Sequence, residues 1–288
     1  MKIHVKKVNA FTESKNGGNA AGVVLDSPKL TDKQMMQVSK ILKVSETAFV
    51  FPSKNADYKV RFFSPTVEVD LCGHATIATF FTMASNGFFK HSRKVTQETK
   101  AGILPVNILF FDDKVDRVMM TQSRPIYKNI HFDISKLASS LKIKPDDIDD
   151  SLPRQIVSTG LFTLPVCIKS FNILKKMKPD FLKVKNLCDE IGVGSIHVFT
   201  FETLEPRSVY HARNFAPVYG VNEDPVTGTA NGAVCCYLVK NGIVQERNLV
   251  CEQGDVIGKP GRVFVEVGRN FVKVGGKAII FDEKDLDI

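Results

Sequence analysis

Apolar and polar positions along the first part of the chain follow mostly a strand pattern. The opening stretch, K-I-H-V-K-K-V-N-A-F at 2–11, alternates as a strand with one buried face does. A glycine-rich loop at 16–22 leads into a short apolar run at 22–25, which predicts a second strand. Residues 45–51 and 58–63 are also typical of strands. This part of the chain is therefore predicted to be largely sheet.

The stretch 31–43 departs from this pattern and predicts an amphipathic helix. Thr31 and Gln34 have the spacing of a capping box, in which each side chain bonds to the other residue's backbone. Apolar residues follow at helical spacing, at positions 35, 38, 41 and 42. We expect a helix over 32–43 with one face against the sheet.

A segment of different character begins at Gly73. The run H-A-T-I-A-T-F-F-T-M-A-S-N at 74–86 carries no charged residue, and Gly87 follows it. A helix without a polar face must be buried on all sides. At about 1.5 Å per residue it is about 20 Å long, too short to span a bilayer. The pattern therefore predicts a helix inside a core, wrapped by curved sheet.

The second half of the chain repeats the motifs of the first half in the same order. R-F-F-S-P at 61–65 returns as R-N-F-A-P at 213–217, and D-L-C-G at 70–73 returns as D-P-V-T-G at 224–228. A helix pattern at 179–192 stands before a strand, as the first helix does. An ordered set of matches at near-equal spacing indicates an internal repeat.

The repeat defines the expected domain organisation. Each helix-start glycine opens a nearly uncharged run, and the segments 73–87 and 228–242 have the same length. We expect two similar domains, 1–122 and 123–288. The pattern does not decide which domain the last strands join, so these strands are allowed to cross back to the first domain.

Composition excludes several classes of protein. The chain has 288 residues, of which 43% are hydrophobic and 24% charged, as in globular proteins long enough for two domains. No stretch reaches the about 18 apolar residues of a membrane span, and the N-terminus lacks a signal-peptide core, so we expect a cytoplasmic protein. The net charge is +8, but the basic residues are scattered and tryptophan is absent. This favours small anionic ligands over nucleic acid.

Cysteine and histidine spacings give no sign of a metal site. The six cysteines form no C-x-x-C and the six histidines form no H-x-x-x-H, so no metal is predicted. Disulfides are not expected in a reducing compartment. Cys72 and His74 are not predicted to act as nucleophile and base, because residues at i and i+2 do not face each other on a helix. Cys72 is expected to serve in the turn.

The two buried helices begin at Gly73 and Gly228, and their starts are candidate anion sites. A helix start has unpaired N–H groups and a partial positive charge, so two starts that face one cleft would bind a carboxylate. The alternative, that Asp70 and Asp224 only cap helices, stays open. Small polar residues around the starts leave room for a ligand: Cys72, His74, Thr76, Thr227, Thr229 and Asn231.

Glu46 is the candidate acid/base. It stands in the strand S-E-T-A-F-V-F at 45–51, among apolar and small residues. A carboxylate there either ends the strand in solvent or is a buried acid with a raised pKa. In the second case it is a general acid/base, an arrangement worth roughly 10²–10⁴-fold in rate.

Several of these motifs, in this order, resemble the phenazine-biosynthesis PhzF-like family of isomerases. The resemblance implies an α+β fold like that of diaminopimelate epimerase. Such a fold has two pseudo-symmetric domains, each a β-barrel-like sheet around a central helix, with the active site in the cleft between them. It also implies a cofactor-free isomerase that forms a homodimer. The motifs are N-A-F-T at 9–12, G-N-A-A-G-V-V at 18–24, S-E-T-A-F-V at 45–50, D-L-C-G-H-A-T at 70–76, D-P-V-T-G-T-A at 224–230 and E-Q-G-D-V-I-G-K-P-G at 252–261.

The resemblance also implies roles for individual residues. The family's characterised reaction is a proton shift along a cyclohexadiene acid, and Glu46, His74 and Asp224 match its catalytic positions. Thr229 replaces the family's serine, which keeps the hydroxyl and adds a methyl group, and residue 20 is alanine where proline is common. The substrate-binding positions implied are Asn19, Cys72, Gly73, Thr227, Gly228 and Thr229.

The leading hypothesis is an isomerase that moves a proton on a small carboxylate-bearing substrate. Diaminopimelate epimerase and proline racemase, whose fold this family is expected to share, use two cysteines, each just before a helix-start glycine. Here those positions hold Cys72 and Thr227, and threonine is far too weak an acid to act as a thiolate does. Three alternatives stay open: an epimerase that uses Glu46 with Cys72, a non-catalytic binding protein, and another acid/base reaction such as an elimination.

Overall fold

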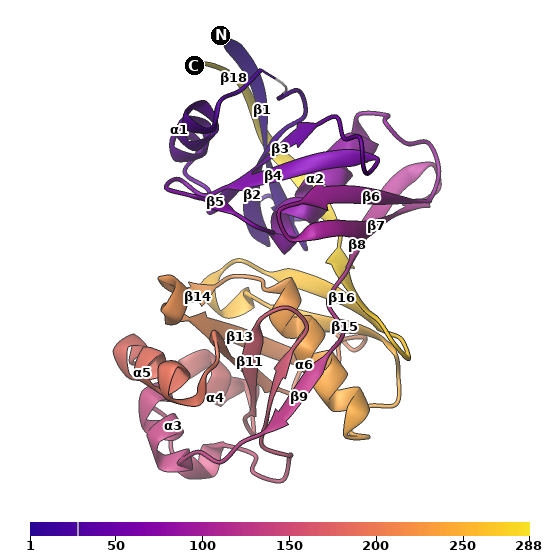
Figure 1. The fold of residues 1–288 in the computed structure, drawn as a ribbon. Helices are drawn as coiled ribbons and strands as arrows, with labels where there is room; N and C mark the ends of the chain where they lie inside the picture. The colour runs from indigo at the N-terminus through magenta and orange to yellow at the C-terminus, as the bar shows by residue number, and fades with distance from the viewer. Residues whose placement is uncertain (28) are drawn as a thin grey trace. The chain divides into compact units, whose positions relative to one another are not determined.

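The computed structural model describes residues 1–27 and 29–288, and the chain divides into two compact units (Figure 1). Unit 1 contains residues 1–121 and 275–288, and unit 2 contains 122–274. The expected second domain ran to residue 288, whereas unit 2 ends at Val274. The last strand belongs to unit 1 because it pairs along its length with the first strand of the chain.

Within the described residues, unit 1 is one curved mixed sheet with two helices. Its strands run in the order β18-β1-β2-β3-β4-β6-β7-β8, and β2–β3 and β4–β6 are the parallel pairs. The elements are β1 (Lys2–Ala10), β2 (Asn19–Val24), α1 (Asp32–Leu42), β3 (Glu46–Phe51), β4 (Tyr58–Phe63), β5 (Glu68–Val69), α2 (Gly73–Ser85), β6 (Arg93–Thr99), β7 (Gly102–Phe111), β8 (Lys114–Thr121) and β18 (Ala278–Asp287).

The sheet of unit 1 wraps around α2. This helix contacts β18, β1, β2 and β3 on one part of the sheet and β7 and β8 at its other end. Its uncharged sequence leaves threonine hydroxyls in the core, and three of them donate to the carbonyl four residues earlier, at 2.7–2.9 Å. Such back-bonding satisfies a buried hydroxyl without a partner outside the helix. The predicted buried helix is thus confirmed.

The amphipathic helix α1 is also confirmed. Thr31 and Gln34 form the capping box, and the helix ends at Lys43 in a left-handed conformation. Its buried face carries Met35, Val38 and Leu42, which pack in one cluster with core side chains of β1, β2, β3 and β4.

Unit 2 is a second mixed sheet with four helices. Its strands run in the order β9-β10-β11-β12-β13-β15-β16, with β11–β12 and β13–β15 parallel. The elements are β9 (Ile126–Asn129), α3 (Ile134–Leu141), β10 (Gln155–Ser158), β11 (Phe162–Cys167), α4 (Phe171–Lys176), α5 (Phe181–Ile191), β12 (Ser195–Thr200), β13 (Tyr210–Ala216), β14 (Val221–Asp224), α6 (Gly228–Lys240), β15 (Asn248–Gln253), β16 (Gly261–Val267) and β17 (Val272–Gly276), which spans the boundary between the units, with short 3-10 turns η1 (Pro145–Asp147), η2 (Pro217–Tyr219) and η3 (Asp255–Ile257).

The sequence repeat corresponds to a repeated order of strand pairing. From β1 to β7 the successive pairs are antiparallel, parallel, antiparallel, parallel and antiparallel. From β10 to β16 the succession is the same. A buried helix packs on each sheet, since α6 contacts β10, β11, β12 and β16. The two units therefore share their topology.

The repeated arginines brace the short strand that leads to each buried helix. Arg61 on β4 binds Glu68 of β5 through two nitrogens at 2.8 Å, and its guanidinium lies 5.0 Å from the Phe63 ring. Arg213 on β13 binds Glu223 of β14 in the same way, at 2.8 and 2.7 Å. Such bidentate pairs fix geometry as well as charge. The motif R-x-F thus has a structural role in both units.

The helices α2 and α6 also end alike. Gly87 and Gly242 follow them with φ of +79° and +69°, a conformation that L side chains rarely adopt. This explains the equal spacing of glycines that the sequence shows. Among residues 1–27 and 29–288, no helix is long and apolar enough to cross a membrane.

Candidate functional site

The start of α2 and the start of β3 bring three predicted site residues together in unit 1. Glu46 is the first residue of β3 and pairs with Ala21 of the parallel strand β2. Cys72 is the N-cap of α2, with an extended backbone at φ −137° and ψ 116°. His74 is the second residue of the helix and turns its ring back toward both side chains.

The contacts within this cluster are short. His74 Nε2 lies 3.2 Å from Glu46 Oε2 and 3.2 Å from Ser45 Oγ. Cys72 Sγ lies 3.4 Å from His74 Nδ1. The distance between Glu46 Oε2 and His74 Nε2 is that of an ion pair. Within the described residues, Glu46 Oε2 receives no well-directed hydrogen bond. Ser45 is a contact that the sequence analysis missed, although it precedes Glu46 in the same motif.

The prediction that Cys72 and His74 stay apart is wrong. The rule that residues at i and i+2 diverge applies within a helix. Cys72 precedes the helix and is extended, so its side chain folds over the first turn and meets the His74 ring.

Of the two interpretations of Glu46 that the sequence left open, the buried acid with a raised pKa is wrong. Burial by itself would raise it, but the His74 ring together with Ser45 and Cys72 outweighs burial and lowers the pKa below its ordinary value of 4.5. Burial would likewise lower the pKa of His74, but the Cys72 sulfur and the Glu46 carboxylate hold it well above 6.5. Burial raises the pKa of the Cys72 thiol. Glu46, whose pKa is lowered, is therefore ionised near pH 7, and it faces a His74 ring whose pKa is raised.

This arrangement supplies a base and an acid side by side. The Glu46 carboxylate has lone pairs for a proton, and the His74 imidazolium has protons to donate. Gly73 begins the helix directly before His74, and a Cβ placed there would meet nothing within 4 Å. The absence of a side chain leaves its backbone open to a ligand. Asn19, buried at the start of β2, lies two residues before the partner of Glu46.

The other predicted residues lie at the start of α6 in unit 2. Asp224 ends β14, Thr227 is the N-cap of α6, and Gly228 begins the helix. The Thr227 hydroxyl donates to the Asp224 carboxylate. Thr229, in the first turn, accepts a hydrogen bond at its carbonyl from Thr159 Oγ1.

Gln253, which the sequence analysis did not single out, holds this helix start in place. Its side-chain oxygen accepts from Thr227 N at 3.1 Å and from Asn231 Nδ2 at 2.7 Å. Its amide nitrogen donates to the Asp224 carbonyl at 2.9 Å. Gln253 is fully buried, so each of these bonds has no competition from water. Its place in the E-Q-G-D motif was the available signal.

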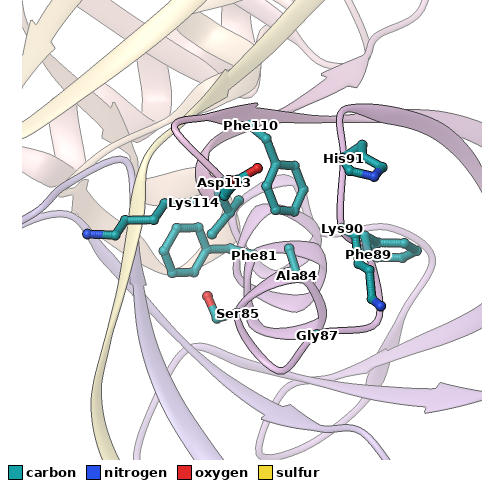
Figure 2. A pocket seen from close by; sticks show the side chains of 11 residues that line it. Phe81, Ala84, Ser85, Gly87, Phe89, Lys90, His91, Phe110, Asp113 and Lys114 are labelled. Atoms are coloured by element: carbon teal, nitrogen blue, oxygen red, sulfur yellow. The ribbon is translucent and has the colours of Figure 1, made fainter.

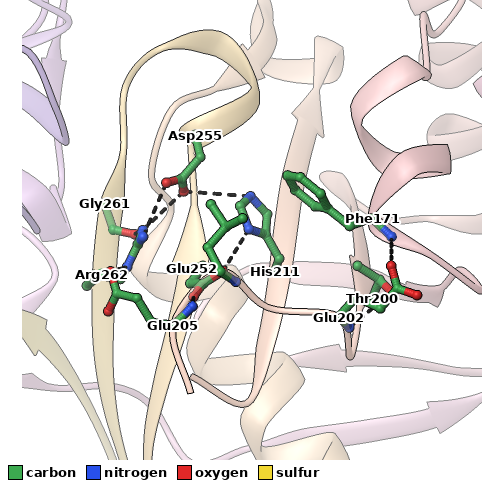
Figure 3. Close-up of polar contacts among 10 residues, drawn as sticks. Phe171, Thr200, Glu202, Glu205, His211, Glu252, Asp255, Gly261 and Arg262 are labelled. Carbon is green, nitrogen blue, oxygen red and sulfur yellow. Dashed lines mark hydrogen bonds and ion pairs between the residues drawn. The ribbon is translucent and has the colours of Figure 1, made fainter. Parts of the chain in front are cut away.

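A second buried polar cluster in unit 2 includes two residues of the same E-Q-G-D motif, Glu252 and Asp255 (Figure 3). Glu252 accepts from His211 Nδ1 at 2.8 Å and from the backbone N–H groups of Leu204 and Glu205, at 2.9 and 2.7 Å. Asp255 bridges His211 and Arg262. Burial alone would raise the pKa of Glu252, but these hydrogen bonds lower it to about 2. His211 and Glu252 are fully buried, which indicates a structural role.

A pocket of about 720 Å³ lies in unit 1 near the C-terminal end of α2 (Figure 2). Phe81, Phe89 and Phe110 face it, with Lys90 and Lys114 at its edge. Its lining comes from 81–91 and 110–115, whereas the predicted site residues of unit 1 lie at the other end of α2 or on β2 and β3. We therefore place the chemistry at the helix start and not in this pocket.

The cluster at the start of α2 is also a possible set of metal ligands. Glu46, Cys72 and His74 each offer one donor atom, and these atoms lie within 4.8 Å of one another. The spacings C-x-x-C and H-x-x-x-H indicate only ligands that lie close together in the sequence. They cannot indicate a set in which Glu46 comes from a different element.

Comparisons with known proteins agree with this fold. A family model described as phenazine biosynthesis-like protein matches residues 8–284. An uncharacterized isomerase of Bacillus subtilis is 38% identical, over 87% of this chain and 85% of the relative. The crystal structure of a PhzF-family phenazine biosynthesis protein from Bacillus anthracis is 34% identical, with a TM-score of 0.92 over all of both chains. A hydroxyproline epimerase from Agrobacterium vitis shares the fold alone, at 13% identity and a TM-score of 0.61 over 99% and 91% of the chains.

The relatives identify the chain as an enzyme of the isomerase class, and its mixed α+β fold is shared with a hydroxyproline epimerase. Within that class the chain belongs to the phenazine biosynthesis-like family, as the match over nearly its whole length shows.

Proposed function

We propose that the protein moves a proton between carbon atoms of a small carboxylate-bearing substrate, with Glu46 as the acid/base and without a cofactor. The observation that carries this proposal is the Glu46–His74 pair, 3.2 Å apart at the open start of α2. A carboxylate this close to an imidazolium keeps its lone pairs available as a base at neutral pH.

The remaining groups fit the same reaction. The N–H groups at the start of α2 bind the substrate carboxylate, as helix starts bind anions. Binding there acidifies the adjacent C–H by stabilising the negative charge that forms. His74 donates to that charge. Asp224, which accepts a hydrogen bond from Thr227 in unit 2, matches the family's third catalytic position, and its role in orienting the substrate stays a prediction.

A purely binding function is less well supported. It requires a Glu46 that faces solvent and lies away from the helix start, whereas this side chain is only 24% exposed and contacts His74. An anion-binding protein also gains nothing from a second carboxylate beside its site, because like charges repel.

The test is solvent-deuterium incorporation into a panel of small acids, followed by NMR in D₂O. β,γ-Unsaturated carboxylates report a double-bond shift, and α-amino acids report epimerisation. We expect the protein to exchange a carbon-bound proton in one group, and Glu46→Gln to slow this by about 10²-fold or more. Glu13→Gln, at an exposed position, is the matched control. Unchanged exchange in Glu46→Gln would exclude the mechanism.

A second candidate, an epimerase that uses Cys72 with Glu46, is favoured by one contact, the 3.4 Å between Cys72 Sγ and His74 Nδ1. Against it, burial raises the pKa of that thiol, and the repeat places Thr227 at the partner position.

Cys72→Ser separates the two candidates. If Glu46 alone transfers the proton, serine keeps a small polar group at the N-cap and the exchange rate changes by less than about tenfold. If Cys72 is a base, exchange of α-amino acids falls by several orders of magnitude. The melting temperature of the variant controls for folding.

A further inference from the structure

The Glu46, Cys72 and His74 side chains form a compact set of unlike donor atoms. They supply a thiol sulfur, an imidazole nitrogen and a carboxylate oxygen from two elements, the start of β3 and the start of α2. All three side chains are at least three-quarters buried, so a bound ion would be shielded from most of the solvent. Zn²⁺ accepts each of these donor types in proteins.

The distances fit a tetrahedral ion. Zinc bonds of ordinary length at tetrahedral angles separate N and O donors by about 3.4 Å and N and S donors by about 3.6 Å. His74 Nε2 lies 3.2 Å from Glu46 Oε2 and 3.8 Å from Cys72 Sγ. Two of the three donor–donor separations are thus within a few tenths of an ångström of the tetrahedral values, and all three donor atoms lie within 4.8 Å of one another.

From this geometry we propose that Glu46, Cys72 and His74 bind one Zn²⁺ ion, with water in the fourth position, and that the bound ion blocks proton transfer. Binding exchanges protons for the metal: the Cys72 sulfur loses its proton to solvent, and His74 Nε2 gives up its proton to present a lone pair. The blocking part rests on the proposed function, because it follows from occupying the Glu46 and His74 lone pairs.

The binding part is tested without a substrate. Untagged, chelator-treated protein is titrated with Co²⁺ and followed by absorption, and with Zn²⁺ by calorimetry. We expect one ion per chain and a thiolate-to-cobalt charge-transfer band. Cys72→Ser should abolish the band, and His74→Asn or Glu46→Gln should weaken zinc binding by at least about tenfold. Cys167→Ser, another buried cysteine, should change neither.

Two results would overturn the site: no saturable binding, or a band that persists in Cys72→Ser. Melting temperatures show whether each variant is folded, and Cys72→Ala provides a second test if serine perturbs the turn. The blocking part is tested by the deuterium assay, in which Zn²⁺ should stop exchange and a chelator restore it. Zinc binding with full activity would refute the inhibition by zinc and leave the proposed zinc site standing. An inactive metal-free protein that still binds zinc would count against the proposed function alone.

Discussion

At the scale of single residues, the pairing of Glu46 with His74 determines the state of the site. Burial shifts each pKa in one direction and the neighbouring side chains shift it in the other, and for both residues the hydrogen bonds and charges of the neighbours together outweigh burial. The resting site therefore holds a carboxylate and an imidazolium and not two neutral groups. The proposed base and the proposed acid are thus both present before substrate binds.

The pH dependence of activity follows from these directions. Because the pKa of Glu46 is lowered, the acid limb of kcat/KM should lie below pH 4.5. Because the pKa of His74 is raised, the alkaline limb should lie well above pH 6.5. The rate of deuterium exchange against pH measures both limbs. In Ser45→Ala the acid limb should move upward, since Ser45 helps to lower the pKa of Glu46. A wild-type acid limb above pH 4.5 would contradict the ion pair.

At the scale of elements, matched parts of the two units hold the helix starts. The β4–β5 and β13–β14 pairs each carry a forked arginine–glutamate bond, and each lies just before a buried helix. The units differ in burial: Arg213 is more enclosed than Arg61 and also donates to the Leu174 and Met177 carbonyls of unit 2.

This difference predicts unequal costs of the same substitution. Arg213→Met leaves Glu223 and two carbonyls without their buried partner, which should cost about 3–5 kcal/mol. Arg61→Met should cost less, about 1–3 kcal/mol, because solvent reaches that side chain. Urea midpoints by circular dichroism measure both, and Arg213→Met with Glu223→Gln should recover part of the loss. Equal midpoints for the two single variants would refute the explanation by burial.

At the scale of the whole molecule, acid stability should depend on the buried Glu252 cluster. The pKa of Glu252 is lowered from 4.5 to about 2, so its ionised form stabilises the fold above pH 4.5. This contribution is lost as the pH falls from 4.5 toward 2. The urea midpoint should therefore decline over this range, and less steeply in Glu252→Gln. Parallel declines in both proteins would assign acid sensitivity to other groups.

The expected homodimer stays a prediction at this scale.

Local sequence patterns predicted those features of the elements that depend on interactions between residues close together in the chain. The capping box of Thr31, the charge-free helix at Gly73 and the glycines that end both buried helices depend on neighbours a few residues away. The same kind of reasoning failed for Cys72 and for the pKa of Glu46. Both depend on the position of the His74 ring relative to a residue outside its own helix. The role of Gln253 was not predicted for the same reason, because its partners lie on other elements.

The sequence by itself determined the two buried helices, their internal repeat and the family to which the chain belongs. The helices follow from periodicity and charge, the repeat follows from the order of matching motifs, and the family follows from the resemblance of those motifs. Only the tertiary structure decided that the last strand joins unit 1, and that Glu46, Cys72 and His74 meet at one helix start. Strand pairing joins residues 1–10 to 278–287, and the ion pair joins β3 to α2. Contacts between such distant parts of a chain arise from packing, which no local pattern encodes.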